Sequence, residues 1–233
     1  MQRLDKLLSQ AGVASRKELK TMVRAGRVTV DGIVVKNPEL KVDETLAQVC
    51  VDGQPVGKHR IVVLMLHKPA GVLSAVEDKR QKTVLDLLPE ELQRRGLSPV
   101  GRLDKDTEGL LLLTNDGDLT HRLLSPRHHV DKVYYARVEG CLEEADCTAF
   151  AQGMTLGDGL ECMPAGLEIL SSNEALVTLQ EGKFHQVKRM LAARGKPVLY
   201  LKRLSMGALQ LDERLLPGEF RMLTQEELAS LEK

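Results

Sequence analysis

The sequence predicts an α+β protein in which a small N-terminal domain, residues 1–58, precedes a larger body, residues 59–233, built on a mostly antiparallel sheet. Three observations support this prediction. Positive charge gathers near the N-terminus, although the 233 residues hold 33 basic and 33 acidic side chains. Turn-forming residues cluster at 52–59, where we expect a short linker near 56–61. Beyond them, candidate strands and helices follow without regular alternation, which disfavours a doubly wound sheet.

The charge asymmetry points to an anionic partner for the N-terminal domain. Residues 1–58 contain ten Lys or Arg against seven Asp or Glu, which leaves 23 against 26 in the body. The neutral average, taken alone, would argue against a nucleic-acid-binding protein. Within residues 1–30, however, seven basic residues face only Asp5 and Glu18. This local excess of cations favours binding to a polyanion.

Other classes of protein are not indicated. No apolar run approaches the roughly 20 residues that cross a bilayer, and the first residues are charged, unlike a signal peptide. The four cysteines form no Cys-x-x-Cys pair and have no histidine at metal-ligand spacing. We therefore expect a cytoplasmic protein with no membrane association and no metal site.

Two short helices and a hairpin are predicted in the N-terminal domain. Apolar residues at positions 4, 7, 8 and 11 form one face of a helix that Gly12 ends. Ser15 and Glu18 have the spacing of a capping box, which begins a second helix. Asp31 and Gly32 form a hairpin turn signal between two valine-rich segments.

The second helix carries a row of cations at spacings of four, four and three. One interpretation is an ordinary solvated helix face. No acidic residue interrupts the row, which favours contact with a phosphate backbone instead. The order of helix, Ser-Arg-Lys helix and Val-x-Val-Asp-Gly hairpin also resembles the RNA-binding module named after a small-subunit ribosomal protein, over residues 1 to about 50. The candidate RNA-binding residues are Arg16, Lys17, Lys20, Arg24 and Arg27.

The body begins with the apolar run 61–66, which has the length of a buried strand. The other expected elements are strands at 110–114, 132–138, 175–180 and 198–201 and helices at 118–124, 142–152, 186–193 and 225–232. The loop 101–109 contains Asp104 between two glycines and is followed directly by an apolar strand. A carboxylate there would be held firmly, as a catalytic group must be, although Asp and Gly are also common in surface turns.

Two further segments are candidates for chemistry. Tyr134 and Tyr135 are adjacent in a predicted strand and must point to opposite faces, so that one fills the core or stacks on a base. Lys188 lies in the first turn of the helix 186–193, where a positive charge interacts unfavourably with the helix dipole unless an anion lies beside it. Lys188 is therefore either paired with a carboxylate or phosphate, or an ordinary solvated lysine.

Taken together, these segments resemble the pseudouridine synthases of the RsuA type. The segments that carry the resemblance are Gly-Arg-Leu-Asp-x-x-Thr-x-Gly-Leu-Leu-Leu-Leu-Thr-Asn-Asp-Gly at 101–117, Leu-His-Lys-Pro-Ala-Gly at 66–71, Thr-Val-Leu-Asp-Leu-Leu-Pro at 83–89, Lys-x-Tyr at 132–134 and Gly-x-x-His-Gln-Val-Lys-Arg-Met at 182–190. The resemblance implies that Asp104 is the essential aspartate, Tyr134 an active-site tyrosine and Lys188 the basic partner of the aspartate. Many members of the family carry arginine at the position of Lys188, and lysine cannot form a bidentate fork.

The implied reaction is the isomerisation of uridine within RNA, which requires no cofactor because substrate and product have the same atoms. Asp104 would act either as nucleophile at C1′ or as the base that removes the C2′ proton. Arg102 would either contact the phosphate of the extruded nucleotide or support the loop.

The implied partner is ribosomal RNA. Residues 124–129 and 185–190 are more similar to the small-subunit enzymes, which favours 16S RNA within an assembling small subunit as the target of a monomeric enzyme. The alternatives are a catalytically silent RNA-binding or ribosome-assembly protein on the same scaffold, and a nucleoside glycosidase that would release free uracil.

Overall fold

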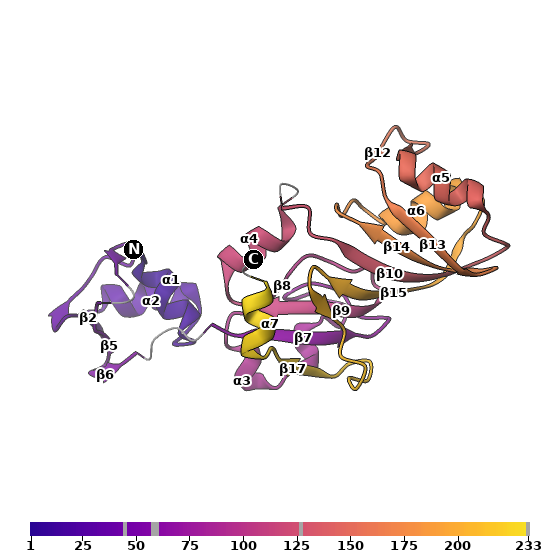
Figure 1. Ribbon diagram of the computed structural model, residues 1–233. Helices are drawn as coiled ribbons and strands as arrows, with labels where there is room; N and C mark the ends of the chain where they lie inside the picture. Colours follow the sequence, from indigo (N-terminus) through magenta and orange to yellow (C-terminus); the bar gives the residue numbers. More distant parts are fainter. Residues whose placement is uncertain (44–45, 57–60, 126–127, 232–233) are drawn as a thin grey trace. The chain divides into compact units, whose positions relative to one another are not determined.

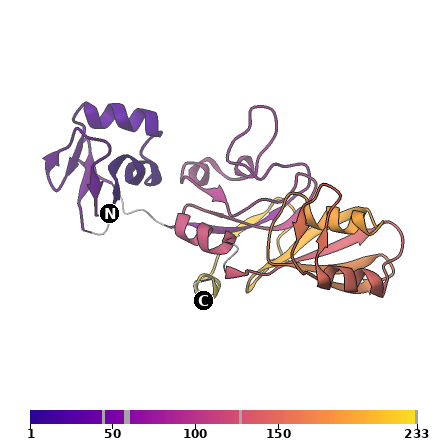
Figure 2. The ribbon, with the colours of Figure 1, turned by 90° about the horizontal axis from the view of Figure 1, so that it is seen from above.

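The computed structural model describes residues 1–43, 46–56, 61–125 and 128–231, and its contacts divide the chain into two compact units (Figures 1 and 2). One unit comprises Met1–Val62 with Leu88–Ser98, and the other comprises Val63–Leu87 with Pro99–Lys233. Of the linker expected near 56–61, residues 57–60 lie outside the described ranges. Among the described residues, no helix has the length and apolar character needed to span a membrane.

The N-terminal part of the first unit, which we call the head (residues 1–56), packs two helices together over a small sheet. Its elements are β1 (Gln2–Arg3), α1 (Leu4–Gln10), α2 (Arg16–Arg24), β2 (Val28–Val30), β3 (Ile33–Val34), β4 (Lys41–Val42), β5 (Val49–Val51) and β6 (Gln54–Pro55). The four-stranded sheet has the order β3-β2-β5-β6 and is antiparallel, and β1 pairs with β4. Leu4 and Leu8 from α1 meet Leu19 and Val23 from α2 in a fully buried core. The apolar face predicted for the first helix is therefore confirmed, and it packs against an apolar face of α2.

The capping box and the hairpin turn that the sequence predicts in the head are both present in the structure. The Ser15 hydroxyl accepts a hydrogen bond from the Glu18 backbone N–H, and the Glu18 carboxylate accepts one from the Ser15 N–H at 2.9 Å. This capping box satisfies free N–H groups at the start of α2. Between β2 and β3, Asp31 and Gly32 both have positive φ, at 49° and 79°. That pair of conformations matches the twist of a two-residue hairpin.

The second unit contains one large sheet. Its strand order is β13-β14-β10-β15-β9-β7-β17, with β16 beside β15. Every pairing along this order is antiparallel except that of β15 with β9, which confirms the mostly antiparallel sheet. The strands after the head are β7 (Val63–Lys68), β8 (Ser98–Pro99), β9 (Glu108–Thr114), β10 (Lys132–Val138), β11 (Met154–Thr155), β12 (Glu161–Cys162), β13 (Gly166–Ser171), β14 (Glu174–Leu179), β15 (Val198–Met206), β16 (Leu209–Gln210) and β17 (Phe220–Met222). The helices of this unit are α4 (Gly117–Leu124), α5 (Glu144–Gln152), α6 (Gln186–Ala193) and α7 (Gln225–Ser230), with a 3-10 turn at Leu85–Leu87, whereas α3 (Glu90–Gln93) belongs to the first unit.

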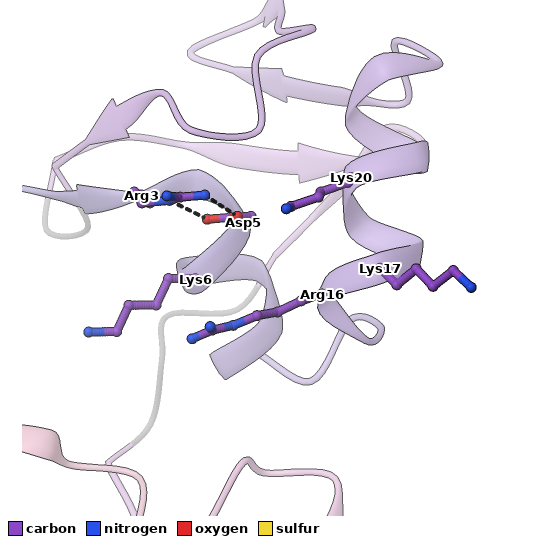
Figure 3. A pocket seen from close by; sticks show the side chains of 6 residues that line it. All are labelled: Arg3, Asp5, Lys6, Arg16, Lys17 and Lys20. Carbon is purple, nitrogen blue, oxygen red and sulfur yellow. Dashed lines mark hydrogen bonds and ion pairs between the residues drawn. The ribbon is translucent and has the colours of Figure 1, made fainter.

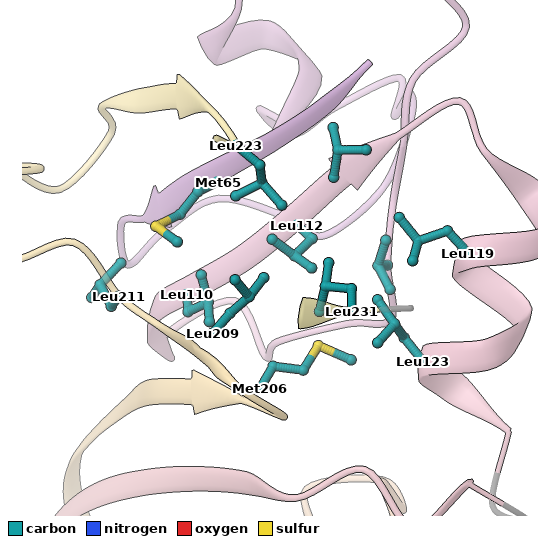
Figure 4. Packing of buried hydrophobic residues seen from close by; sticks show 12 residues of the cluster. Met65, Leu110, Leu112, Leu119, Leu123, Met206, Leu209, Leu211, Leu223 and Leu231 are labelled. Atoms are coloured by element: carbon teal, nitrogen blue, oxygen red, sulfur yellow. The ribbon is translucent and has the colours of Figure 1, made fainter. Parts of the chain in front are cut away.

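The centre of this sheet is buried on both faces. All residues of β7, and all of β9 after Glu108, are buried. Leucines of α4 and α7 pack with one face of these strands in the cluster shown in Figure 4. The predicted strand 61–66 begins two residues later than expected, because Ile61 remains 58% exposed.

A close strand crossing fixes the end of the loop that precedes β9. β15 pairs with β9 in parallel over two residues only, and Arg203 lies opposite Gly109. A Cβ at Gly109, where φ is +106°, would lie 2.2 Å from the Arg203 carbonyl oxygen, so the crossing requires glycine. The buried Arg203 side chain also donates from Nε to the Leu110 carbonyl at 2.8 Å. The loop 101–109 is thereby anchored at its C-terminal end.

Candidate functional site

The loop that carries Asp104 is held by contacts to its backbone. The Ser74 hydroxyl donates to the Leu103 carbonyl at 2.8 Å and accepts from the Leu103 N–H at 3.0 Å. The Thr107 N–H donates to the Asp104 carbonyl at 3.1 Å, which closes a turn just after the aspartate. The residues on both sides of Asp104 are thus fixed without using its carboxylate, which stays available for chemistry.

Lys68 supports the same loop from within the body. It is fully buried at the end of β7, and its ammonium donates to the carbonyls of Pro69 (3.0 Å), Lys105 (3.2 Å) and Thr107 (2.9 Å). Burial lowers the pKa of Lys68 to about 8, although the neighbouring carboxylate of Asp106 opposes the shift. Residues 105 and 107 lie on the loop, so Lys68 ties it to β7.

The depressed pKa of Lys68 predicts a pH dependence of stability. Between about pH 8 and 10.5, the folded protein has released this proton while the unfolded chain still holds it. The unfolded state then binds more protons, so this group makes the free energy of unfolding rise with pH, by up to about 3 kcal/mol. Urea unfolding of the parent protein and Lys68→Met at pH 7.5 and pH 10 should show a stability difference that grows with pH. A difference that stays constant would contradict this account.

Asp104, Lys188 and His185 form one cluster. Lys188 Nζ lies 3.1 Å from Asp104 Oδ2, and His185 Nε2 lies 3.4 Å from Asp104 Oδ1. The Lys188 side chain is only 21% exposed. Lys188, in the first turn of α6, is therefore paired with the Asp104 carboxylate, and the alternative of a freely solvated lysine is wrong. Each carboxylate oxygen of Asp104 faces a different nitrogen, Oδ2 the ammonium of Lys188 and Oδ1 the imidazole of His185.

Lys188 also pairs with a second carboxylate that the sequence analysis did not single out. Its ammonium lies 2.5 Å from Asp106 Oδ1, and this contact is the main cause that lowers the pKa of Asp106. Asp106 is 75% exposed at its side chain, whereas that of Asp104 is 24% exposed. The lysine thus bridges an outer and an inner carboxylate. Only the spacing Asp-x-Asp in the loop could have suggested this arrangement.

Tyr134 faces the same site from the central sheet. It is 8% exposed and lies with Asp104 in the wall of a cavity of about 70 Å³. Tyr135 points away, as predicted for adjacent strand residues, and donates its hydroxyl to Glu174 Oε1 at 2.6 Å. The residues that line the cavity are Arg102, Leu103, Asp104, Thr107, Tyr134, Leu179, Gly182, Lys183, His185, Gln186, Val187 and Leu201. The structure thus brings Arg102, Asp104 and Tyr134 together, with Lys188 against the aspartate.

A separate cationic cleft lies on the head. It has a volume of about 410 Å³ and is lined by Arg3, Asp5, Lys6, Arg16, Lys17 and Lys20, which come from α1, α2 and the residue before α1 (Figure 3). Arg3 donates to both oxygens of Asp5, at 3.0 and 2.8 Å, and so neutralises the single acid of the cleft. Within the described part of the chain, Arg16, Lys17 and Lys20 form no ion pair. The lining therefore carries a net positive charge and suits an anion.

The predicted row of cations is shorter than expected. α2 ends at Arg24, so Arg27 lies beyond the helix and does not continue its face. The Arg27 guanidinium instead forms a two-point ion pair with Asp52, with Nε 2.8 Å from Oδ1. The spacing of three from Arg24 to Arg27 was misleading, because Gly26 adopts a positive φ of 73° and ends the helix.

Comparison with known proteins agrees with this geometry. The family model described as RNA pseudouridylate synthase matches residues 62–193, and the model of the S4 domain matches residues 2–46. These two ranges contain the Asp104 cluster and the cationic cleft, respectively.

Whole-chain relatives point the same way. An uncharacterized RNA pseudouridine synthase of Bacillus subtilis, YtzG, is 49% identical over 97% of this chain and 96% of its own length. Ribosomal small subunit pseudouridine synthase A of Vibrio cholerae is 43% identical over 99% of this chain and 100% of its own, and that of Escherichia coli is 40% identical over 98% and 99%. A crystal structure of a pseudouridylate synthase superimposes with a TM-score of 0.72 at 35% identity, over 99% of this chain and 100% of that one. The chain therefore belongs to the family of RNA pseudouridine synthases and carries an S4 domain at its N-terminus.

Proposed function

We propose that this enzyme isomerises a uridine of ribosomal RNA, in the 16S RNA of an assembling small subunit, with Asp104 as the essential carboxylate. The observation that carries the proposal is the Asp104 cluster. A carboxylate with Lys188 Nζ at 3.1 Å lies at a cavity shared with Tyr134, on a loop fixed by its backbone. The names of the relatives from Vibrio cholerae and Escherichia coli support the small subunit as the source of the RNA.

The residues of the cavity suit the bond changes of the reaction. The N1–C1′ bond breaks, C5 bonds to C1′, C5 loses a proton and N1 gains one. An ionised Asp104 either attacks C1′ or removes the C2′ proton and returns it. The ammonium of Lys188 lies 3.1 Å from this carboxylate and provides its counter-charge. Tyr134 is placed to contact the uracil and to assist removal of the C5 proton.

Extrusion of the uridine from its stack costs a few kcal/mol, which contacts to the RNA backbone must offset. We propose that the head supplies such contacts mainly through Arg16, Lys17, Lys20 and Arg24, with a smaller contribution from Arg27, whose guanidinium is already paired with Asp52. We also propose that Arg102 contacts the extruded nucleotide at the cavity. On this proposal residues 1–58 are the RNA-binding domain and residues 59–233 the catalytic domain. The enzyme would act as a monomer in the cytoplasm.

The cleft of the head leads to a test of this binding role. Arg16→Gln with Lys20→Gln removes two cations that line the cleft. If both contact phosphates, the slope of log affinity against log salt should fall by about 1.4–1.8, since each contact contributes about 0.7–0.9. Arg27→Gln is the matched control, because Arg27 is already paired with Asp52 and should change the slope less. The slopes are measured by filter binding to 16S RNA. An unchanged slope for the double variant would show that the cleft is not part of the RNA-binding interface.

The function itself is tested by mapping pseudouridine in ribosomal RNA from cells with and without the protein. Loss of one 16S pseudouridine, restored by the parent gene, is the expected result. Purified enzyme should release tritium from 16S RNA labelled at C5 of uracil, without releasing free uracil. A binding protein would release no tritium, and a glycosidase would liberate the base. A site lost from 23S RNA instead would correct the proposed substrate.

A further inference from the structure

Phe184 is exposed in a chain that has few aromatic residues. Of the three tyrosines and three phenylalanines, all of which the structure describes, only Phe184 is exposed, with 70% of its surface accessible. The other five are buried or half-buried. A single exposed apolar side chain needs no explanation by itself. What distinguishes Phe184 from the other exposed apolar residues is its contact with the residues around Asp104.

The ring lies next to the Asp104 cluster. Phe184 stacks on His185 with ring centroids 3.8 Å apart and planes 19° apart. His185 Nε2 in turn lies 3.4 Å from Asp104 Oδ1. One face of the phenyl ring is covered by the imidazole, and the high exposure of Phe184 shows that the opposite face is open. The imidazole ring of His185 thus lies between the Asp104 carboxylate and the phenyl ring, whose open face is flat and apolar.

The segment that carries the ring is tied down. The side chain of Gln186 is buried, accepts a hydrogen bond from the Lys183 N–H at 3.0 Å and donates to Glu181 Oε1 at 2.5 Å. Between these points, His185 has a left-handed φ of 50°. Such a conformation persists in a residue other than glycine only where the surroundings hold it. The backbone that carries Phe184 is therefore held between Lys183 and His185, two residues that line the cavity.

The size of the cavity limits what can enter it. Its volume of about 70 Å³ is well below the roughly 300–1,000 Å³ of pockets that enclose a drug-sized ligand. The target uridine must open it further, and the next nucleotide has to remain outside, at the rim. When the uridine leaves its stack, the bases beside it lose a stacking partner. Aromatic side chains bind unstacked bases of single-stranded RNA through their faces.

We propose that the open face of Phe184, backed by His185, stacks on the nucleobase next to the target uridine. The proposal rests on the proposed function and adds a binding site for a second nucleotide of the same RNA. Because an aromatic face accepts any base, the site contributes affinity and placement of the strand, and it discriminates little between sequences.

The test uses the 16S fragment that contains the mapped uridine, prepared with its normal sequence and with an abasic ribose on either side. The proteins are the parent, Phe184→Leu, Phe184→Tyr and, as a surface control, Met222→Ala on the edge strand β17, where Met222 is 53% exposed. For each combination of protein and RNA fragment, the dissociation constant is measured at one salt concentration, and the single-turnover rate is measured at saturating RNA.

Phe184→Leu should bind the normal fragment about tenfold more weakly, within the range known for loss of one stacked base. Its rate at saturation should stay close to that of the parent, and Phe184→Tyr and Met222→Ala should bind like the parent. One of the two abasic fragments should show the same loss with the parent but no additional loss with Phe184→Leu, because both changes remove the same contact.

Equal affinities of the parent and Phe184→Leu for the normal fragment would overturn the proposal. So would an affinity loss from Phe184→Leu that adds in full to the loss caused by each abasic fragment. A lower rate at saturation with unchanged affinity would place the target uracil on Phe184 and also overturn it. Failure of the proposed function would appear differently, as absence of conversion of any 16S uridine by the parent protein.

Discussion

Asp104→Asn should lower turnover by at least about 10⁴-fold, because the amide can neither attack C1′ nor accept the C2′ proton. The fold should be unaffected. The loop is held through Ser74 at the backbone of Leu103 and through Lys68 at loop carbonyls, and neither contact uses the Asp104 side chain. RNA affinity should be retained or slightly increased, because the change removes a negative charge that repels phosphate.

Single-turnover release of tritium from C5-labelled RNA measures the chemistry, and filter binding measures the affinity. Asp106→Asn is the matched control, since Asp106 lies on the same loop, contacts the same lysine and is 75% exposed at its side chain. It should keep most of the activity. Conversion by Asp104→Asn at a rate comparable to the parent would exclude Asp104 as the essential group.

Local sequence signals predicted much of the fold because their causes are local. The capping box of α2 and the hairpin between β2 and β3 depend on residues within four positions of each other. The buried strands β7 and β9 are readable as apolar runs. The strand expected at 198–201 continues to Met206 because polar residues such as Arg203 and Ser205 are buried there. Their burial is set by strand partners elsewhere in the chain, which periodicity does not report.

The site was predicted less completely than the fold. Family resemblance pointed to Asp104, Tyr134 and Lys188, whereas the helix dipole argument left a choice between an anion near Lys188 and a solvated lysine. Two other contacts depend on positions that the sequence does not encode locally. Lys68 follows an apolar run like many surface lysines, yet its ammonium is buried among carbonyls of a loop 37 and 39 residues away. His185 lies 3.4 Å from Asp104, which is distant in the sequence, and its own backbone is left-handed.

Lys188→Met should reduce turnover by about 10²- to 10³-fold, the range for loss of one electrostatic contact in an active site. Methionine keeps most of the apolar stem and removes the charge that bridges Asp104 and Asp106. The two carboxylates then face each other without the shared cation, which favours protonation of one of them. Activity of this variant should therefore recover in part as the pH is raised, whereas the parent should show less dependence over the same range.

Lys188→Arg provides the decisive comparison because it keeps the charge and changes the geometry. The guanidinium can fork across two oxygens, and the partly exposed site, with 21% of the lysine side chain accessible, leaves room for it. We expect most of the activity to be kept, with a pH profile like that of the parent. If Lys188→Met were fully active at every pH while Asp104→Asn is inactive, the ion pair at 3.1 Å would have no role in the reaction, and only the pairing of the two residues in catalysis would be excluded.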